Sequence, residues 1–234
     1  MKNIAIILAS GTGDRSGLSL PKQFFEIDGK TLLEIVVTTF NNHTKVDEII
    51  VVVNVEFIEL AKELLAGFSK VKKIVEGGAT RQESSFNGVM AVDETECNVL
   101  IHDAARAFVS ERAISTCIDG LEVHKAVCAA VNSTDTVFVV DDDGKIIDIP
   151  SRGNLKCAQT PQCFRYSLIK KAHELACEGK IKVTDDCGLV LNSGLGEIYT
   201  IEGDTDNRKI TYSEDFDFAK RIYKKRLDLK NGSC

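Results

Sequence analysis

Three glycines and two cations follow the first apolar segment of the chain. The glycines are Gly11, Gly13 and Gly17, and the cations are Arg15 and Lys22. Glycine lets a backbone bring its N–H groups close to an anion, and Arg and Lys add fixed positive charge. The spacing predicts a loop that holds phosphates. A surface turn with ordinary solvated charges is the other interpretation, and the loop alone does not separate the two.

Neither of two common phosphate-binding motifs fits this loop. The dinucleotide fingerprint G-x-G-x-x-G needs its third glycine one place before Gly17, and an acidic residue where the second predicted strand ends at Asn54. The P-loop pattern G-x-x-x-x-G-K-[ST] does not occur in the sequence. These mismatches disfavour a nicotinamide-dependent dehydrogenase and indicate a third kind of phosphate loop, with two cations.

A carboxylate stands just beyond another apolar segment, residues 99–101. It belongs to Asp103, within the run H-D-A-A-R at 102–106. Magnesium binds a few carboxylates together with waters and phosphates, so Asp103 at the carboxyl end of a strand is a candidate ligand. A helix-capping Asp is the competing interpretation. We expect His102 to be a packed, hydrogen-bonded side chain and not a catalyst.

Other polar groups recur beyond later predicted strands. Gly77 and Gly78 precede a helix in which Ser84 could hydrogen-bond a base edge, although an ordinary strand-to-helix turn explains the same residues. Lys209 offers another cation near the end of the chain. The runs Q-T-P-Q at 159–162 and T-D-D at 184–186 are expected in loops, as turns and caps.

Apolar segments alternate with amphipathic ones, which predicts an open, mostly parallel sheet with helices on both faces. Strands are expected at 4–9, 48–53, 72–75, 98–102, 125–131 and 197–201. Helices are expected at 32–40, 55–66, 82–91, 111–122, 167–177 and about 213–227. The sequence therefore predicts one α/β domain over residues 1–234, with its ligands at the carboxyl ends of the strands.

One stretch breaks the alternation. Two short β-rich runs, 136–140 and 145–149, flank the acidic turn D-D-D-G at 141–144. This pattern predicts a β-arm at about 136–150. The arm is either a surface meander or an element that embraces a second subunit.

Composition excludes several classes of protein. Hydrophobic content of 44% and charged content of 27% are ordinary for a globular domain, and the net charge of −6 offers no general attraction to nucleic acid or anionic membrane. No apolar run is long enough to span a bilayer, and the start of the chain is not expected to be a signal peptide. The eight cysteines are scattered without a C-x-x-C pair, which favours reduced thiols and a cytoplasmic location.

Taken in order, the motifs resemble one family, the cytidylyltransferases that make CDP-methylerythritol in isoprenoid synthesis, with their relatives that make CDP-ribitol. The shared pattern is the Gly-rich loop with its Arg, P-K-Q, G-G-x-x-R-x-x-S, H-D-A-A-R, D-T, an Arg before Q-T-P-Q, T-D, and N-x-K-x-T. The matching positions run from Gly11 to Thr211, which is nearly the whole chain. Ser10, Ala107 and Phe138 depart from the family pattern.

The resemblance implies a Rossmann-like, three-layer αβα nucleotidyltransferase fold with a protruding β-arm. It implies transfer of CMP from CTP to a small polyol phosphate, with Mg²⁺ as cofactor and pyrophosphate as the leaving group. The expected acceptor is 2-C-methyl-D-erythritol 4-phosphate, and the alternative is ribitol 5-phosphate. It also implies a homodimer, in which Arg106 and Thr136 reach across the interface on the arm. A non-catalytic nucleotide-binding module is the alternative of another class.

Each matching position also takes a role from the resemblance. The implied catalytic residues are Arg15, Lys22 and Lys209. The implied nucleotide-binding residues are Ala9, Ser10, Gly11, Thr12, Gly13, Gly78, Ala79, Ser84, Asp103 and Ala104. The implied acceptor-binding residues are Arg106, Thr136, Arg152, Thr160 and Thr184, and the implied metal ligands are Asp103 and Asp206. A phosphate monoester is mostly a dianion at neutral pH, since its second pKa is about 6, so the expected nucleophile needs no general base.

Overall fold

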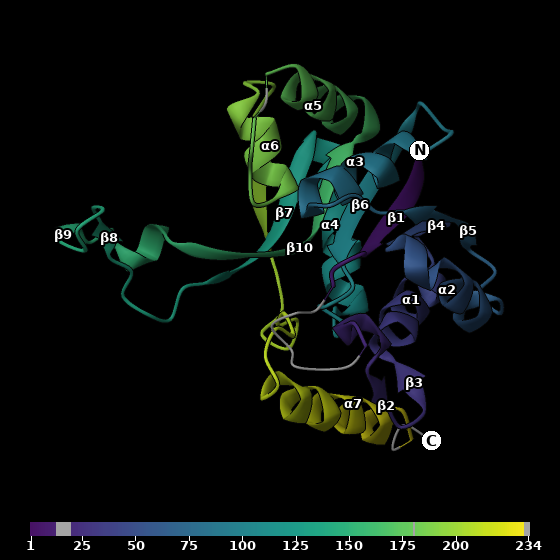
Figure 1. The fold of residues 1–234 in the computed structure, drawn as a ribbon. Coiled ribbons are helices and arrows are strands. Elements are labelled where there is room, and N and C mark those ends of the chain that lie inside the picture. Colours follow the sequence, from purple (N-terminus) through teal and green to yellow (C-terminus); the bar gives the residue numbers. More distant parts are fainter. Residues whose placement is uncertain (13–19, 180, 232–234) are drawn as a thin grey trace.

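The computed structural model describes residues 1–12, 20–179 and 181–231, and a seven-stranded sheet forms its centre (Figure 1). The strands of this sheet are β1 (Lys2–Ala9), β4 (Glu48–Val53), β5 (Val71–Glu76), β6 (Cys97–Asp103), β7 (Ala126–Asn132), β10 (Lys156–Arg165) and β11 (Tyr199–Glu202). The α-helices are α1 (Leu32–Asn42), α2 (Ile58–Leu65), α3 (Arg81–Met90), α4 (Glu111–Val123), α5 (Tyr166–Gly179), α6 (Asp186–Asn192) and α7 (Asp215–Asn231). The six predicted strands and six predicted helices are all present.

The strand order β11-β7-β10-β6-β1-β4-β5 creates a switch point between β1 and β6. From β1 the chain first adds β4 and β5 on one side, and then returns to place β6 on the other side, all in parallel. Connections leave these two strands in opposite directions, so a crevice opens beyond their carboxyl ends. Ala9 and Asp103 are the last residues of these strands, which places both beside the crevice.

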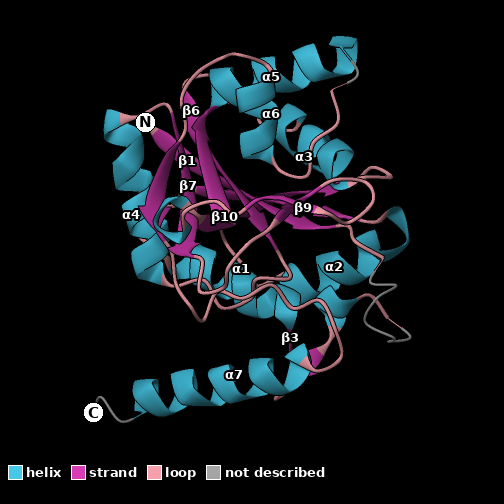
Figure 2. Cartoon of the chain, turned by 90° about the vertical axis from the view of Figure 1, so that its left-hand side faces the viewer, coloured by secondary structure: helices cyan, strands magenta, loops and turns pink. Residues whose placement is uncertain are grey.

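Helices cover both faces of the sheet, as the alternation predicted (Figure 2). Successive side chains of a strand point to opposite faces. In β1, Ala5 and Ile7 pack with α1, α2 and α4, whereas Ile4 and Ile6 pack with α3, α5 and α6. Every residue from Ile4 to Ala9 is buried, because a strand covered on both faces has no solvent side. The three-layer αβα architecture is therefore confirmed.

Strand β10 corrects the prediction that residues 159–162 form a loop. It runs antiparallel between β6 and β7, in the interior of the sheet. Pro161 argued against a central strand, because proline has no N–H to donate to a neighbour. The pairing of β10 with β7 shifts between Ala158 and Gln162, so the proline lies where the ladder is irregular. The Thr160–Pro161 peptide bond is cis.

Two smaller units complete the fold. The hairpin of β2 (Glu26–Ile27) and β3 (Lys30–Thr31) packs with α7 in a separate apolar cluster that contains Phe108 and Ile210. The hairpin of β8 (Val139–Val140) and β9 (Ile146–Asp148) stands away from the body of the molecule as the predicted arm (Figure 1). Among the described residues, no helix combines the length and the apolar character needed to cross a membrane.

Candidate active site

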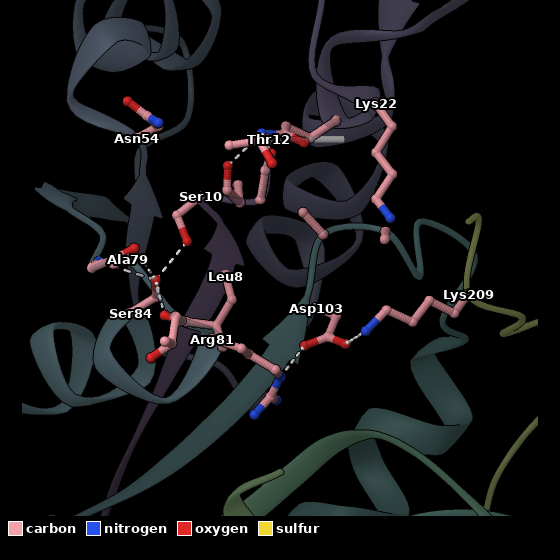
Figure 3. Close-up of a pocket in the computed structure, with 17 residues that line it drawn as sticks. Leu8, Ser10, Thr12, Lys22, Asn54, Ala79, Arg81, Ser84, Asp103 and Lys209 are labelled. Carbon is pink, nitrogen blue, oxygen red and sulfur yellow. Dashed lines mark hydrogen bonds and ion pairs between the residues drawn. The ribbon is translucent and has the colours of Figure 1, made fainter. Parts of the chain in front are cut away.

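A cavity of about 330 Å³ lies at the switch point and is called here the switch-point cavity (Figure 3). Its walls come from the ends of β1 and β6, from the turn that begins α3, and from two lysines of distant segments. Ser10, Thr12, Lys22, Asp103 and Lys209 are among its lining residues. Lys22 extends from the opposite wall toward Lys209 and Asp103 (Figure 3). The cavity thus brings together Ser10, Gly11 and Thr12 of the predicted nucleotide loop, the Asp103 carboxylate and the two predicted lysines that the structure describes.

Asp103 is held between two cations. One of its carboxylate oxygens accepts a hydrogen bond from Nε of Arg81 at 3.0 Å, and the other accepts from Nζ of Lys209 at 2.7 Å. Its side chain is 11% exposed. Burial raises the pKa of Asp103, but the charges of Arg81 and Lys209 outweigh it and hold that pKa well below its ordinary value. Asp103 is therefore a fixed negative charge facing the cavity.

Arg81 lines the cavity as well, although its place in the motif G-G-x-x-R-x-x-S did not predict a role for it. It is the first residue of α3, whose N-cap Thr80 accepts a hydrogen bond from the backbone of Glu83. Burial lowers the pKa of the Arg81 guanidinium, and Asp186 and Asp103 together raise it above its ordinary value. This cation therefore stays charged while it joins two carboxylates.

His102 and Thr160 lie beneath Asp103, away from the cavity. The ring of His102 is fully buried, with Nε2 3.0 Å from the Arg106 carbonyl oxygen and Nδ1 3.0 Å from the Thr160 hydroxyl. The same hydroxyl accepts a hydrogen bond from the backbone N–H of Asp103 at 3.1 Å. His102 is the packed, hydrogen-bonded histidine that the sequence predicted. Thr160, predicted to bind the acceptor, is 3% exposed and is not among the residues that line the described cavities, so that role stays a prediction, and the contact it makes is with the backbone of Asp103.

The end of β1 is fixed by Gln23, another residue without a predicted role. Its side-chain amide donates to the carbonyl oxygens of Ala9 and Gly11, at 2.6 and 3.0 Å. The P-K-Q motif could have indicated that Gln23 has a role. The carbonyl groups that its amide binds are known only from the structure. Gln23 thereby fixes the backbone at the end of β1, from Ala9 to Gly11.

Ser84 joins the α3 turn to the end of β1. Its hydroxyl accepts hydrogen bonds from Ser10 at 2.7 Å and from the Gly78 N–H at 3.1 Å, and donates to the Thr80 carbonyl at 2.9 Å. The backbone of Gly77 lies so close to Ser10 that a Cβ on Gly77 would be 2.3 Å from the Cβ of Ser10. Ser84 lines the cavity but is 1% exposed, so its reading of a base stays a prediction.

A second, larger cavity adjoins the first and is called here the cationic cavity. It has a volume of about 970 Å³, and Arg106, Lys156, Arg208 and Lys209 are among its lining residues. Lys209 lines both cavities. Arg106 is tied to its own chain by hydrogen bonds to the carbonyl oxygens of Asn207 and Ala158, at 2.9 and 3.1 Å. Three cations beside the shared lysine suit a second anionic ligand.

The structure does not bring every predicted residue to these cavities. Thr136 and Arg152 are exposed near the base of the arm, where Arg152 donates to the Thr134 carbonyl at 3.3 Å. Thr184 is exposed just before α6, and Asp206 pairs with Lys225 at 3.6 Å. None of these four side chains lines either cavity in the described part of the chain. Gly13 and Arg15 lie outside the described residues, and their roles remain predictions.

The carboxylate of Asp103 fits a magnesium ion whose other ligands come largely from the phosphates of a bound substrate. Each carboxylate oxygen accepts a single cationic hydrogen bond and keeps a further lone pair. Within residues 1–12, 20–179 and 181–231, no three His, Cys, Asp or Glu side chains are grouped so that they could hold a metal. Magnesium commonly uses one or two carboxylates together with phosphate oxygens, and the donor set fits that arrangement.

Comparisons with known proteins agree on one family. The sequence model of the family described as IspD, 2-C-methyl-D-erythritol 4-phosphate cytidylyltransferase, matches residues 3–225. The chain is 39% identical over 226 residues to the 2-C-methyl-D-erythritol 4-phosphate cytidylyltransferase of Clostridium botulinum, with 96% of this chain and 98% of that protein covered. A solved 4-diphosphocytidyl-2C-methyl-D-erythritol synthase from Anaerococcus prevotii matches with a TM-score of 0.86 at 34% identity, covering 95% of this chain and 96% of that one.

A relative named for another activity is almost as similar. The bifunctional ribulose 5-phosphate reductase/CDP-ribitol pyrophosphorylase of Haemophilus influenzae is 38% identical over 238 residues. The match covers 98% of this chain and 50% of that protein. The two acceptor chemistries considered from the sequence are therefore both represented among its relatives.

We predict that protonation of His102 destabilises the fold. Burial lowers the pKa of His102 from 6.5 to about 4, so between these values the unfolded chain binds a proton that the folded chain does not. The free energy of unfolding must then decrease as the pH falls from 6.5 toward 4, by up to about 3 kcal/mol from this group.

The His102→Gln variant should be less stable than the wild type at pH 7, but its stability should decline less on acidification. Denaturant unfolding at several pH values between 7 and about 4.5 would measure both slopes. His43 and His173, whose pKa values burial also lowers, should preserve part of the wild-type slope. Equal slopes in the variant and the wild type would show that His102 does not titrate in this way.

Proposed function

The chain belongs to the 2-C-methyl-D-erythritol 4-phosphate cytidylyltransferase family, and we propose that its two adjoining cavities bind the two substrates of that reaction. It is a CTP-dependent nucleotidyltransferase that makes CDP-methylerythritol. The triphosphate of CTP would lie in the switch-point cavity, along the loop after β1. The phosphate of the acceptor would lie in the cationic cavity.

One observation carries this assignment: Lys209 lines both cavities, and its ammonium is 2.7 Å from Asp103. Two polyanions repel each other, and negative charge grows at the α-phosphate during transfer. A cation at the junction of their sites stabilises that charge where it develops. Lys22 reaches the same region from the opposite wall (Figure 3). Arg15, outside the described residues, would add a further cation on the triphosphate.

The reaction needs no proton acceptor from the protein. An oxygen of the acceptor phosphate forms a bond to the α-phosphorus of CTP, the bond from that phosphorus to the bridging oxygen breaks, and pyrophosphate leaves. The attacking oxygen is already ionised at neutral pH. His102 agrees with this mechanism, since its ring is enclosed and its pKa is lowered to about 4. The protein would therefore promote the transfer by holding its cations in fixed positions around the two substrates.

Magnesium is the cofactor we propose, with Asp103 as its protein ligand. When bound, the ion would neutralise part of the triphosphate charge and polarise the phosphorus that is attacked. Asp103 would hold it from the cavity floor, next to Lys209. Asp206 lies outside both cavities and pairs with Lys225 in the described structure, so its part in metal binding remains a prediction from the resemblance.

The arm supports the proposal of a homodimer. Phe138, Val140, Ile146, Ile147 and Ile149 are each between 48% and 59% exposed on this hairpin. A two-stranded hairpin is marginally stable by itself, and a contiguous apolar surface marks an interaction site. We propose that the arms of two copies embrace, so that Thr136 and Arg152 reach the partner's cationic cavity. Arg106, which the resemblance implied would also reach across, instead lines the cationic cavity of its own chain.

A cytoplasmic location also remains a proposal. Cys157 and Cys177 are free thiols on the protein surface, and the buried Cys97, Cys117 and Cys163 are also unpaired. Exposed thiols persist in a reducing compartment, whereas oxidising compartments convert them. The reaction also consumes CTP, a substrate of cellular metabolism.

An acceptor panel tests the proposed reaction. With CTP and Mg²⁺, we expect 2-C-methyl-D-erythritol 4-phosphate to release pyrophosphate with a kcat/KM at least about tenfold above that of ribitol 5-phosphate, since one well-placed contact discriminates by that much. CDP-ribitol formation is the second candidate, favoured by the similarity to the Haemophilus influenzae protein. A reversed preference would establish that candidate. CTP binding without pyrophosphate from any acceptor would indicate a non-catalytic module.

The metal proposal predicts that a chelator stops turnover. With EDTA in excess we expect pyrophosphate release to cease, and added Mg²⁺ should restore it. The Asp103→Asn variant should need a higher Mg²⁺ concentration for half-maximal rate, because a neutral amide is a weaker ligand for a hard cation. Lys62→Ala, a change at an exposed lysine paired with Glu59, is the control and should behave as the wild type. Full wild-type activity in EDTA would remove magnesium from the mechanism.

The dimer proposal predicts complementation between two inactive variants. Lys22→Ala removes a cation from the switch-point cavity, and Arg152→Ala removes one from the base of the arm. In a mixed dimer, one site receives both residues intact from different chains. After equal amounts are unfolded and refolded together, about a quarter of the wild-type turnover should return.

Sedimentation must first show dimers for the wild type and for the refolded mixture. If hybrid dimers form and the mixture stays as inactive as its parents, each site lies within one chain. A monomer at working concentration would reject the assembly itself.

A further inference from the structure

A buried carboxylate lies behind the active site, at the start of α6. Asp186 is 2% exposed. One of its oxygens accepts a hydrogen bond from Nη1 of Arg81 at 2.9 Å, and the other accepts from the hydroxyl of Ser85. Its backbone N–H donates to the side-chain oxygen of Gln162 at 3.0 Å. A buried carboxylate is costly unless it is paired, so the Arg81 contact accounts for how the charge is tolerated.

Asp186 cannot act on a substrate directly. Together with Ser85 and His173 it has the composition of a nucleophilic triad, and Nε2 of His173 is 3.3 Å from the Ser85 hydroxyl. However, Ser85 and His173 are at most 1% exposed, and the Ser85 hydroxyl donates to Asp186 instead of to the histidine. The cluster is enclosed between α3, α5 and α6. Any effect on the reaction must pass through a neighbour, and Arg81 is the neighbour that lines the switch-point cavity.

Arg81 connects the buried carboxylate to the site. Its Nη1 binds Asp186 and its Nε binds Asp103 at 3.0 Å. The guanidinium is planar and rigid, so two carboxylates on different edges fix its orientation as well as its position. Asp103 then offers its second oxygen to Lys209 at 2.7 Å. Negative and positive groups alternate along this line from the interior of the protein to the junction of the two cavities.

We propose that Asp186 is a positioning residue for the transfer reaction. It holds Arg81 from behind, Arg81 holds Asp103, and Asp103 holds the ammonium of Lys209 between the two substrates. This inference rests on the proposed function of Lys209. Without the charge of Asp186, Arg81 keeps Asp103 as its one anionic partner among the described residues, and it can turn about its side-chain bonds. Lys209 then loses the fixed orientation of the carboxylate that it binds.

The neighbouring residue provides a matched control. Asp185 caps α6 by accepting a hydrogen bond from the Gly188 N–H at 2.8 Å, and its other oxygen accepts from the Gln162 amide at 2.8 Å. Asp185→Asn therefore makes the same chemical change at the same helix start, without touching Arg81. Asparagine is about as good an N-cap as aspartate, so this variant should stay folded, with a turnover number close to that of the wild type.

The experiment compares steady-state kinetics of wild type, Asp185→Asn and Asp186→Asn. We expect Asp186→Asn to reduce kcat about tenfold or more, because the orientation of Lys209 matters most when charge develops in the transition state. The KM for CTP should change less than about threefold, because the groups that bind the ground state remain. A kcat for Asp186→Asn equal to that of Asp185→Asn would overturn the proposal. Absence of turnover in the wild type would instead reject the proposed function.

A second pair of variants tests the path through Arg81. Arg81→Lys keeps the charge but cannot span two carboxylates, so it should show the same loss of kcat, even if Asp186→Asn fails to fold. The double variant should be no slower than the slower of the two single variants, because each breaks the same connection. Wild-type kcat in Arg81→Lys would overturn the proposal. So would losses that multiply in the double variant, since Asp186 would then act by another route.

Discussion

The ion pairs of Asp103 determine how the rest of the site is arranged. A carboxylate with an 11% exposed side chain stays ionised because Arg81 and Lys209 outweigh the effect of burial on its pKa. The same contacts join three segments far apart in the chain: the end of β6, the start of α3 and the loop before α7. Each segment needs the other two in place, since a buried charge without its partner is strongly destabilising. The proposed catalytic geometry and the local stability thus depend on the same interactions.

The antiparallel strand β10 supports the carboxylates of this site from within the sheet. Strand β10 brings Thr160 under Asp103, where the hydroxyl accepts from the Asp103 N–H and contacts His102. It also brings Gln162 to the start of α6, where its side chain binds the backbone of Asp186. A parallel strand ending at the switch point would direct its last residues into the crevice. The antiparallel β10 instead places Thr160 and Gln162 against the backbone N–H groups of Asp103 and Asp186, away from the switch-point cavity.

The sequence predicts the frame of the fold better than it predicts these supports. Alternation of apolar and amphipathic segments identifies β1, β4 and β6, because buried parallel strands have short, unbroken apolar runs. It misses β10, because Gln159, Thr160 and Pro161 have the composition of a turn and are buried by tertiary contacts. The order of the motifs predicted that Lys22, Asp103 and Lys209 belong to one active site, and the structure places all three around one cavity. Arg81 and Gln23 received no role, because their importance lies in which distant atoms they contact.

The separation of the two cavities follows from the electrostatics of the reaction. Two polyanions cannot share one pocket before transfer without strong repulsion, so each needs its own cations and a meeting point that carries positive charge. The switch point supplies the first pocket through the ends of β1 and β6, whereas the edge formed by β7, β10 and β11 supplies the second. Under the proposed function, the site lies where the topology of the sheet changes, and one anion would bind on each side of that change. Lys209 stands between them because the chain crosses from β11 to α7 at this place, and Asp103 keeps its ammonium directed inward.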